Sequence, residues 1–307
     1  MTLPMVMKSP ALAPEIEIYE VGPRDGLQNE SFIVPTDVKR EFIERLVAAG
    51  LKTVEATSFV HPTWVPQLAD AEELIAQLDL NGSVPLPVLV PNERGLDRAI
   101  AAGVTHIAIF ASATETFARK NLNSTLDTQF AMYEPVVARA REAGLDVRAY
   151  VSMCFGDPWE GQVPIDQVVT TGKRLLDMGA SQLSLGDTIG VGTPGHVMEL
   201  IESFSRARVG VGDLAMHFHD TYGQALSNAM AAIQNGVTSL DASAGGLGGC
   251  PYAESATGNL ATEDLVWMLN GLGIEHGVDL DALIATSVWM GKRLGKEPAS
   301  AVVRALG

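Results

Sequence analysis

Short apolar runs in this chain alternate with longer stretches in which apolar residues recur at helical spacing. Runs of about four to eight residues are typical of strands, and a period of about 3.6 residues is typical of helices. A glycine follows most of the helical stretches, as at Gly50, Gly103 and Gly144, and glycine is common just past a helix end. The pattern predicts strands at residues 15–21, 52–56, 84–90, 106–110, 146–153, 181–185, 214–219 and 237–242, with helices at 36–49, 66–78, 93–102, 125–143, 165–178, 194–206 and 225–235.

This alternation predicts a (β/α)8 TIM barrel, because eight parallel strands joined by helices close into that architecture. An open doubly wound sheet is the alternative. The first strand-to-helix turn, residues 22–26, carries no GxGxxG phosphate fingerprint, which disfavours that alternative. Helical spacing continues at 261–272, 280–294 and 299–306. We therefore expect one catalytic domain over 1–307, with the barrel at about 15–250 and extra C-terminal helices at about 261–307.

Composition narrows the classes of protein that fit the chain. The 307 residues are 47% hydrophobic, which is enough for one large core. The net charge of −16 disfavours a nucleic-acid partner, because such binding needs basic patches. No apolar run is long enough for a membrane span, and residues 1–14 do not resemble a secretion signal. Two cysteines do not make a disulfide framework, so we expect a cytoplasmic protein. We also expect a homodimer or higher homo-oligomer.

Two histidines end the seventh predicted strand. His217 and His219 are two residues apart, so both side chains would point to the same face of that strand. Two adjacent imidazoles on a rigid strand suit a divalent metal ion, since each offers a neutral ring nitrogen. Two packed or hydrogen-bonded structural histidines would give the same pattern, and this pair alone does not decide between them.

The active site of a TIM barrel lies at the C-terminal ends of its strands, and polar residues gather at those positions here. Arg24 and Asp25 follow the first strand, and they could be a surface ion pair or an oxyanion clamp beside a carboxylate ligand. Asp25, His217, His219 and the amide oxygen of Asn259 would give two nitrogen and two oxygen ligands. Because the set holds no thiolate, we expect Mg²⁺ or Mn²⁺ rather than structural zinc.

Cys250 lies between a glycine-rich run and a proline. An inert buried cysteine is one interpretation, and a thiol acid–base on a mobile lid over residues 245–253 is the other. Glu55 is equally a buried structural carboxylate or a catalytic one, and Asp187 could simply cap the next helix. The residues predicted to contact substrate lie in the loops after the strands and include a basic pair that could meet phosphates: Gln28, Ser58, Asp187, Thr188, Arg119, Lys120 and Asn121.

Five motifs give the chain a specific resemblance to the 3-hydroxy-3-methylglutaryl-CoA (HMG-CoA) lyase family, from about residue 15 to about residue 275. They are VGPRDGLQNE at 21–30, LGDTIGVGTP at 185–194, HFHDTYGQ at 217–224, GLGGCPYA at 246–253 and GNLATED at 258–264. The resemblance implies a TIM barrel and metal-dependent cleavage of HMG-CoA to acetyl-CoA and acetoacetate, in leucine breakdown.

By motif, the resemblance implies that Asp25, His217, His219 and Asn259 bind the metal ion. It implies that Arg24 stabilises the enolate oxygen and that Cys250 is the thiol of the lid. The Arg24-Asp25 form resembles the lyases more than the related synthases, which typically carry an arginine–glutamate pair at this place.

Two departures from the family pattern leave the chemistry intact and leave the acyl-chain specificity open. Ser31 stands where the family often has lysine, and Asp157 stands where it usually has cysteine. Both positions lie where acyl or CoA groups would be expected. The same chemistry on a related 3-hydroxyacyl-CoA, such as citramalyl-CoA or a longer branched substrate, is therefore the alternative. A condensing synthase and a non-catalytic barrel that binds metal and CoA are less favoured.

Overall fold

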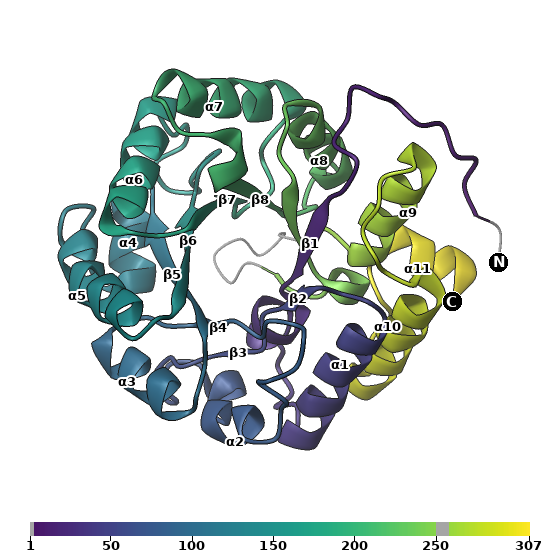
Figure 1. Cartoon of the computed structure of the whole chain (residues 1–307), viewed down its shortest axis with the longest axis horizontal. Helices are drawn as coiled ribbons and strands as arrows, with labels where there is room; N and C mark the ends of the chain where they lie inside the picture. The colour runs from purple at the N-terminus through teal and green to yellow at the C-terminus, as the bar shows by residue number, and fades with distance from the viewer. Residues whose placement is uncertain (1–2, 250–257) are drawn as a thin grey trace.

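The computed structural model describes residues 3–249 and 258–307. Within them, parallel strands form a central sheet surrounded by helices, as Figure 1 shows. The strands are β1 (Glu17–Glu20), β2 (Thr53–Val54), β3 (Thr57–Ser58), β4 (Val88–Leu89), β5 (His106–Ser112), β6 (Asp146–Ser152), β7 (Gln182–Asp187), β8 (Leu214–Phe218) and β9 (Ser239–Ala242). The helices of the ring are α1 (Thr36–Ala48), α2 (Ala71–Ile75), α3 (Glu93–Ala101), α4 (Glu115–Leu122), α5 (Thr128–Glu142), α6 (Ile165–Met178), α7 (Pro194–Arg206) and α8 (Ala225–Gln234).

The sheet closes into a barrel because β2 and β3 are two halves of one extended segment. β2 pairs with β1, and β3 pairs with β4, both in parallel. Between the two halves, Glu55 N donates to Glu20 O at 2.8 Å and Ala56 N donates to Pro87 O at 2.9 Å. The segment therefore bonds to both of its neighbours. The observed strand order runs β2-β1-β9-β8-β7-β6-β5-β4-β3, and the prediction of a (β/α)8 barrel is confirmed.

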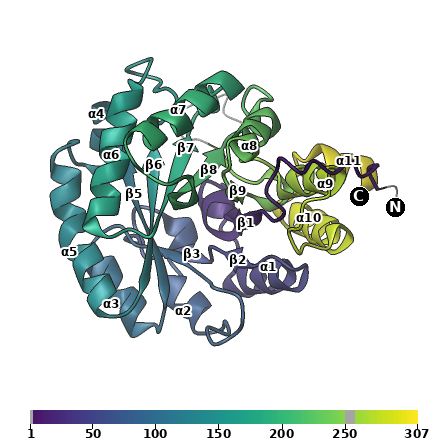
Figure 2. The ribbon, with the colours of Figure 1, turned by 45° about the horizontal axis from the view of Figure 1, so that its top comes forward.

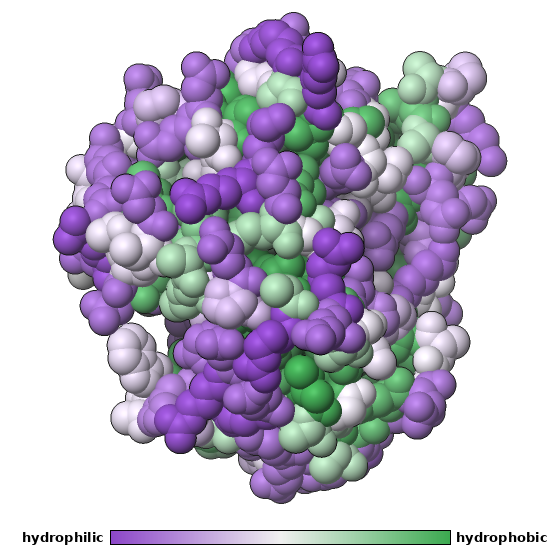
Figure 3. Space-filling view, turned by 60° about the vertical axis from the view of Figure 1, so that its left-hand side comes forward, coloured by the Kyte–Doolittle hydropathy of each residue, from purple (hydrophilic) through white to green (hydrophobic). Residues whose placement is uncertain are grey.

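The main hydrophobic core lies between the strands and the surrounding helices. Outward-facing strand residues such as Ile109 and Leu185 are fully buried against helix residues such as Val137 and Phe204. The interior of the barrel is different, because polar side chains fill much of it and only a small apolar cluster around Tyr150 lies there. The outer surface of the helices on the left of Figure 1 is largely hydrophilic, with apolar side chains visible in gaps (Figure 3).

Prolines and a local hydrogen bond explain where the elements differ from the predicted pattern. The predicted strand at 84–90 shrinks to β4, since Pro85 and Pro87 have no N–H and enter the sheet only through their carbonyl oxygens. The predicted helix at 66–78 is a 3-10 turn (Pro66–Leu68) followed by α2. Asp70 is the N-cap residue of α2, and its side chain accepts a hydrogen bond from Lys39 Nζ at 2.7 Å. Helix α4 contains Arg119, Lys120 and Asn121, which the sequence pattern placed in the loop after the fourth strand.

Three further helices, α9 (Thr262–Leu272), α10 (Leu280–Leu294) and α11 (Ala301–Leu306), lie beside the barrel next to α1 and β1, as Figures 1 and 2 agree. Their buried residues, such as Leu269 and Leu283, belong to the same hydrophobic core as the barrel. This shared core supports the proposal of one catalytic domain. Among the described residues, we find no helix long and apolar enough to cross a bilayer.

Two buried carboxylates connect these helices to the barrel. Glu20 of β1 accepts hydrogen bonds from Ala244 N at 2.8 Å and Thr262 Oγ1 at 2.7 Å, and Glu263 of α9 accepts one from Gly245 N at 2.9 Å. Burial raises the pKa of Glu20 to about 7 and the pKa of Glu263 to about 8, although the hydrogen bonds act in the opposite direction. Both groups therefore bind protons more tightly in the folded state than in the unfolded chain.

We expect the free energy of unfolding to fall as the pH rises from about 5 to about 8, because the folded state must release these extra protons. Linkage gives about 1.4 kcal/mol per pH unit for each such group within that window. Glu263→Gln resembles the neutral carboxyl group and should flatten the dependence, whereas Glu142→Gln, an exposed change on α5, should not. Chemical denaturation at several pH values measures this. Equal slopes in both variants would contradict the assignment.

Candidate metal centre at the mouth of the barrel

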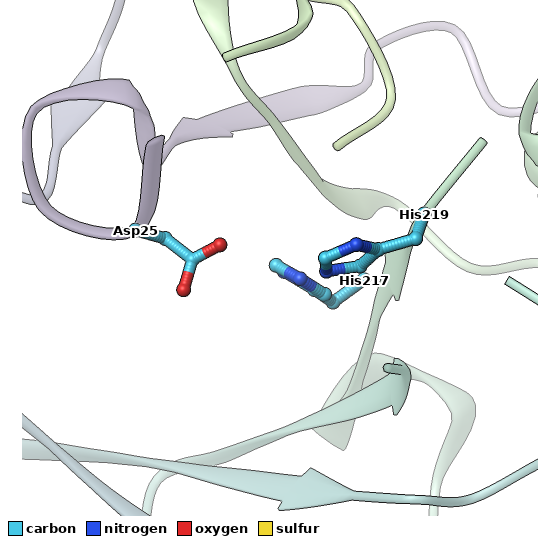
Figure 4. A group of neighbouring side chains, drawn as sticks. All are labelled: Asp25, His217 and His219. Carbon is cyan, nitrogen blue, oxygen red and sulfur yellow. The ribbon is translucent and has the colours of Figure 1, made fainter. Parts of the chain in front are cut away.

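Asp25, His217 and His219 meet at one end of the barrel. One ligand atom from each lies within 4.8 Å of the other two, and the two imidazole ring centroids are 5.2 Å apart. Figure 4 shows the Asp25 carboxylate facing both rings. His217 belongs to β8 and His219 follows its end, so strand periodicity places both on the inner face as predicted.

A tight π-helical turn, Gly22–Gly26, positions Asp25 at the end of β1. The single carbonyl oxygen of Val21 accepts hydrogen bonds from the backbone N–H groups of Arg24, Asp25 and Gly26 at 3.2, 2.8 and 3.1 Å. This turn holds two successive polar side chains at the mouth of the barrel. Single π-turns often occur at functional sites.

Asn259 completes the group. It lies opposite His219 in an isolated antiparallel bridge, and its Nδ2 donates to Asp25 Oδ2 at 2.9 Å and to Leu247 O at 3.0 Å. Both of these partners can only accept, so they fix the orientation of the amide group. The Oδ1 atom is buried and accepts no hydrogen bond from any residue that the structure describes. A buried amide oxygen beside a carboxylate and two imidazoles fits a divalent cation.

The charges around this group act in opposite directions on the pKa of the carboxylate and on the pKa of the imidazole. Burial alone would raise the pKa of Asp25, but Arg24, His217, His219 and the Asn259 hydrogen bond lower it to about 2. Burial would lower the pKa of His217, but its hydrogen bond to Asp241 and the charges of Asp241 and Asp25 raise it. Asp25 is therefore ionised at neutral pH, as a ligand to a cation must be.

Arg24 is buried and held by two carboxylates. Its Nε donates to Glu55 Oε1 at 2.5 Å, and its Nη1 donates to Asp25 Oδ1 at 2.6 Å. Glu55 is itself fully buried and also accepts a short hydrogen bond from the Tyr150 hydroxyl. The guanidinium lies 5.2 Å from the centre of the Tyr150 ring. This arrangement fixes Arg24 in one place beside the candidate metal ligands.

A cavity of about 440 Å³ opens above these residues. Its walls include Arg24, Asp25 and both histidines, together with apolar side chains such as Trp64 and Phe117. Five of the predicted substrate-contacting residues line it, namely Gln28, Ser58, Lys120, Asn121 and Thr188. The cavity thus combines a charged floor with a partly apolar wall.

Two predicted substrate contacts have other partners in the structure. The Asp187 carboxylate accepts hydrogen bonds from Val191 N and Gly192 N, both at 2.9 Å, so it organises the loop after β7. Burial raises the pKa of Asp187 to about 6. Arg119 forms an exposed ion pair with Glu115 at 2.7 Å along α4. A direct role for either residue with substrate stays a prediction.

The glycine-rich run before Cys250 has a defined conformation up to Gly249. Gly245, Gly246 and Gly248 have positive φ angles of 68°, 67° and 119°, which disfavour other residues. A Cβ atom at Gly248 would lie 2.5 Å from Asn259 Nδ2. Glycine is needed here for close approach to a candidate ligand. Cys250 and residues 251–253 of the predicted lid lie outside the described residues, so the lid and its thiol stay predictions.

Three polar side chains of the barrel interior lie outside the predicted site although they adjoin it: Arg148, Tyr150 and Asp241. Arg148 and Tyr150 alternate with outward-facing Ala149 and Val151 along β6. Charged and aromatic residues with a period of two in a central strand indicate an inner face that carries polar groups. Asp241 gives a weaker signal, because it is a single acidic residue in the short strand β9.

Comparisons with known proteins agree with this geometry. A family model described as HMGL-like matches residues 15–289. The mitochondrial hydroxymethylglutaryl-CoA lyase of Arabidopsis thaliana is 51% identical over 291 residues, covering 95% of this chain and 62% of that protein. The cytoplasmic 3-hydroxy-3-methylglutaryl-CoA lyase of Rattus norvegicus is 48% identical, covering 94% and 84%. The crystal structure of hydroxymethylglutaryl-CoA lyase from Pseudomonas aeruginosa has a TM-score of 0.94 at 42% identity, covering 96% and 98%. The chain thus spans less than two thirds of the Arabidopsis relative.

Gly248→Ala should weaken binding of Mn²⁺ by roughly tenfold or more, the usual scale when a group that supports a metal ligand is lost. The new methyl group would force Asn259 or the loop to move, and the φ of 119° is strained for alanine. Gly195→Ala on α7 is the matched control, because a Cβ there meets nothing within 4 Å. Isothermal titration with Mn²⁺ measures both. Unchanged affinity in folded Gly248→Ala would remove the supporting role of this glycine.

Proposed function

The chain belongs to the HMGL-like family, and we propose that it is a divalent-metal-dependent carbon–carbon lyase that cleaves HMG-CoA to acetyl-CoA and acetoacetate. The observation that carries this proposal is the meeting of Asp25, His217 and His219 at one side of a cavity. Asn259 is bonded to Asp25, and its buried Oδ1 accepts no hydrogen bond from any described residue. Arg24 lies beside them with a fixed guanidinium. The reaction needs a Lewis acid, a proton acceptor and an oxyanion partner in one place.

We propose Mg²⁺ or Mn²⁺ as the ion, because imidazole, carboxylate and amide groups form the donor set and no thiolate belongs to it. When bound, the ion supplies Lewis acidity to the tertiary hydroxyl and carboxylate of the substrate. Asp25, with a pKa of about 2, is a good ligand and a weak base. We therefore assign it first to holding the ion and second to accepting the hydroxyl proton.

Cleavage begins when the tertiary hydroxyl loses its proton. The bond between the hydroxyl-bearing carbon and the carbon next to the thioester then breaks, which leaves acetoacetate and the enolate of acetyl-CoA. Negative charge develops on the thioester oxygen, and Arg24 is proposed to stabilise it, since Glu55 and Asp25 hold two of its nitrogens and leave Nη2 for the substrate. Cys250 is proposed to give the proton that converts the enolate to acetyl-CoA.

The cavity wall supports an acyl-CoA substrate. Ser58, Gln28 and Thr188 provide polar groups on the wall, and Lys120 with Asn121 of α4 provides cationic and polar groups. We propose direct substrate contact for these five residues, and supporting positions for Asp187 and Arg119. The cytoplasmic location and the homo-oligomeric state are proposed from the sequence alone, and a place in leucine breakdown follows from the proposed substrate.

The direct test is a panel of CoA thioesters assayed with Mg²⁺ and with Mn²⁺. We expect cleavage of HMG-CoA to exceed cleavage of citramalyl-CoA and of longer branched 3-hydroxyglutaryl-CoA analogues. EDTA should abolish the activity, and added Mg²⁺ or Mn²⁺ should restore it, because Asp25, His217, His219 and Asn259 are proposed to hold one cation. Faster cleavage of citramalyl-CoA would keep the chemistry and replace the substrate. Full activity after exhaustive chelation would remove the metal-dependent mechanism.

Arg24→Lys should lower kcat by about a hundredfold or more with a smaller change in KM, which is the usual scale for losing an oxyanion donor. Lysine has no planar fork, so it cannot bond to Glu55 and Asp25 and still reach the substrate. Arg40→Lys is the control, since Arg40 forms only a partly exposed ion pair with Glu44 on α1. Steady-state kinetics decides the matter, and a near-normal kcat for Arg24→Lys would exclude this role.

A further inference from the structure

A polar network inside the barrel lies directly behind the candidate metal centre. Asp241 of β9 and His217 of β8 are register partners in neighbouring parallel strands. Both side chains occupy the inner face, and His217 Nδ1 lies 3.1 Å from Asp241 Oδ2. His217 therefore contacts a carboxylate with one ring nitrogen and has the other, Nε2, for the group formed with Asp25 and His219.

The other partners of Asp241 show whether the hydrogen between Asp241 Oδ2 and His217 Nδ1 is on the carboxylate or on the ring. Arg148 donates to Asp241 through Nη2 at 2.6 Å and Nη1 at 3.2 Å, and Ser184 Oγ donates to Oδ2 at 2.7 Å. The guanidinium can only donate, and the Ser184 hydroxyl donates as well, so both oxygens of the carboxylate act as acceptors. Asp241 is an acceptor throughout, so Nδ1 of a neutral His217 carries the hydrogen and Nε2 has the lone pair.

Arg148 is itself fixed, so Asp241 has a rigid support. Its guanidinium lies 4.0 Å from the centre of the Tyr19 ring and 5.0 Å from the centre of the Tyr150 ring. Its Nε donates to Gln182 Oε1 at 2.9 Å, and the residue is 4% exposed. Four strands thus contribute to holding one carboxylate: β1, β6, β7 and β9. A surface ion pair would have none of this restraint.

We propose that Asp241, held in place by Arg148, is a positioning residue that fixes the tautomer and the ring orientation of His217 for binding a divalent cation. This inference rests on the metal site of the proposed function and adds to it a residue outside the ligand set. A carboxylate behind a metal-binding histidine orients the ring and strengthens the ligand, and its loss typically weakens metal binding by about 10- to 100-fold.

The first test uses the unaltered, metal-free protein. Nitrogen-15 NMR of labelled histidine at alkaline pH, where the ring is neutral, distinguishes a protonated from an unprotonated ring nitrogen. The His217 signals are assigned by their disappearance in His217→Gln. We expect the hydrogen on Nδ1. A hydrogen on Nε2 would overturn the proposal, and this result needs no variant of Asp241 to fold.

The second test compares Asp241→Asn with Ser184→Ala. In Asp241→Asn the amide oxygen must face Arg148, which only donates, so the amide nitrogen donates toward His217 Nδ1. The hydrogen of the neutral His217 ring then moves to Nε2, which is the atom proposed to bind the cation. We expect the NMR signals to report that exchange and the affinity for Mn²⁺ to fall by about 10- to 100-fold. Ser184→Ala removes one hydrogen bond to the same carboxylate and should change neither the tautomer nor the affinity by more than about twofold.

The outcomes separate this inference from the proposed function. If the unaltered protein binds no Mn²⁺ and cleaves no HMG-CoA, the proposed function fails. If the unaltered protein binds Mn²⁺ and Asp241→Asn binds it equally well with the same tautomer, only the positioning role fails. Equal losses of affinity in Asp241→Asn and Ser184→Ala would also overturn the proposal, because they would reflect general damage to the barrel interior.

Discussion

The register between neighbouring parallel strands is the constraint on which the site depends. Because side chains alternate between the two faces of a strand, one set of positions points into the barrel and the other into the shell of helices. The pairing of His217 with Asp241, and of Asp241 with Tyr19, places the three on one level of the interior. A shift of one residue in β8 would turn both histidines toward the helices.

The side chains that this register directs into the barrel include buried ion pairs, where many TIM barrels have layers of aliphatic side chains. Arg148 with Asp241 and Arg24 with Glu55 are buried pairs. Both guanidinium groups lie close to the ring of Tyr150, whose hydroxyl bonds to Glu55. Desolvation makes such pairs poor sources of stability compared with apolar packing. Their value here is geometric, since each arginine–carboxylate pair fixes the position of a neighbouring group at the mouth. The stability comes from the apolar shell outside the strands.

The sequence could predict the barrel and the shared inner face of the two candidate histidine ligands because these depend on local patterns. Strand and helix periods repeat along the whole chain, and His217 and His219 share a face whatever their neighbours are. The short helix α4 was missed because its polar sequence has no long apolar stripe. Asp241 and Arg148 lie 93 positions apart, and their pairing depends on how strands are ordered around the barrel. No local spacing could have joined them, and nothing in a four-residue strand marks one aspartate as the support of a histidine.

The balance of charge at the mouth has a consequence for the order of binding. In the ion pairs of the two buried arginines, Arg24 and Arg148, three carboxylates (Asp25, Glu55 and Asp241) face two guanidinium groups, so the carboxylates of these pairs exceed the arginines by one. In a buried site such an excess is weakly screened and disfavours entry of a substrate carboxylate. A bound dication would reverse the sign of the net charge of these five side chains. It would leave one positive charge for the carboxylate of the proposed substrate or for the developing enolate. With the proposed cation in place, the site would therefore match an anionic substrate better than without it, and the Asp25 carboxylate, which is ionised at neutral pH, favours binding of the cation.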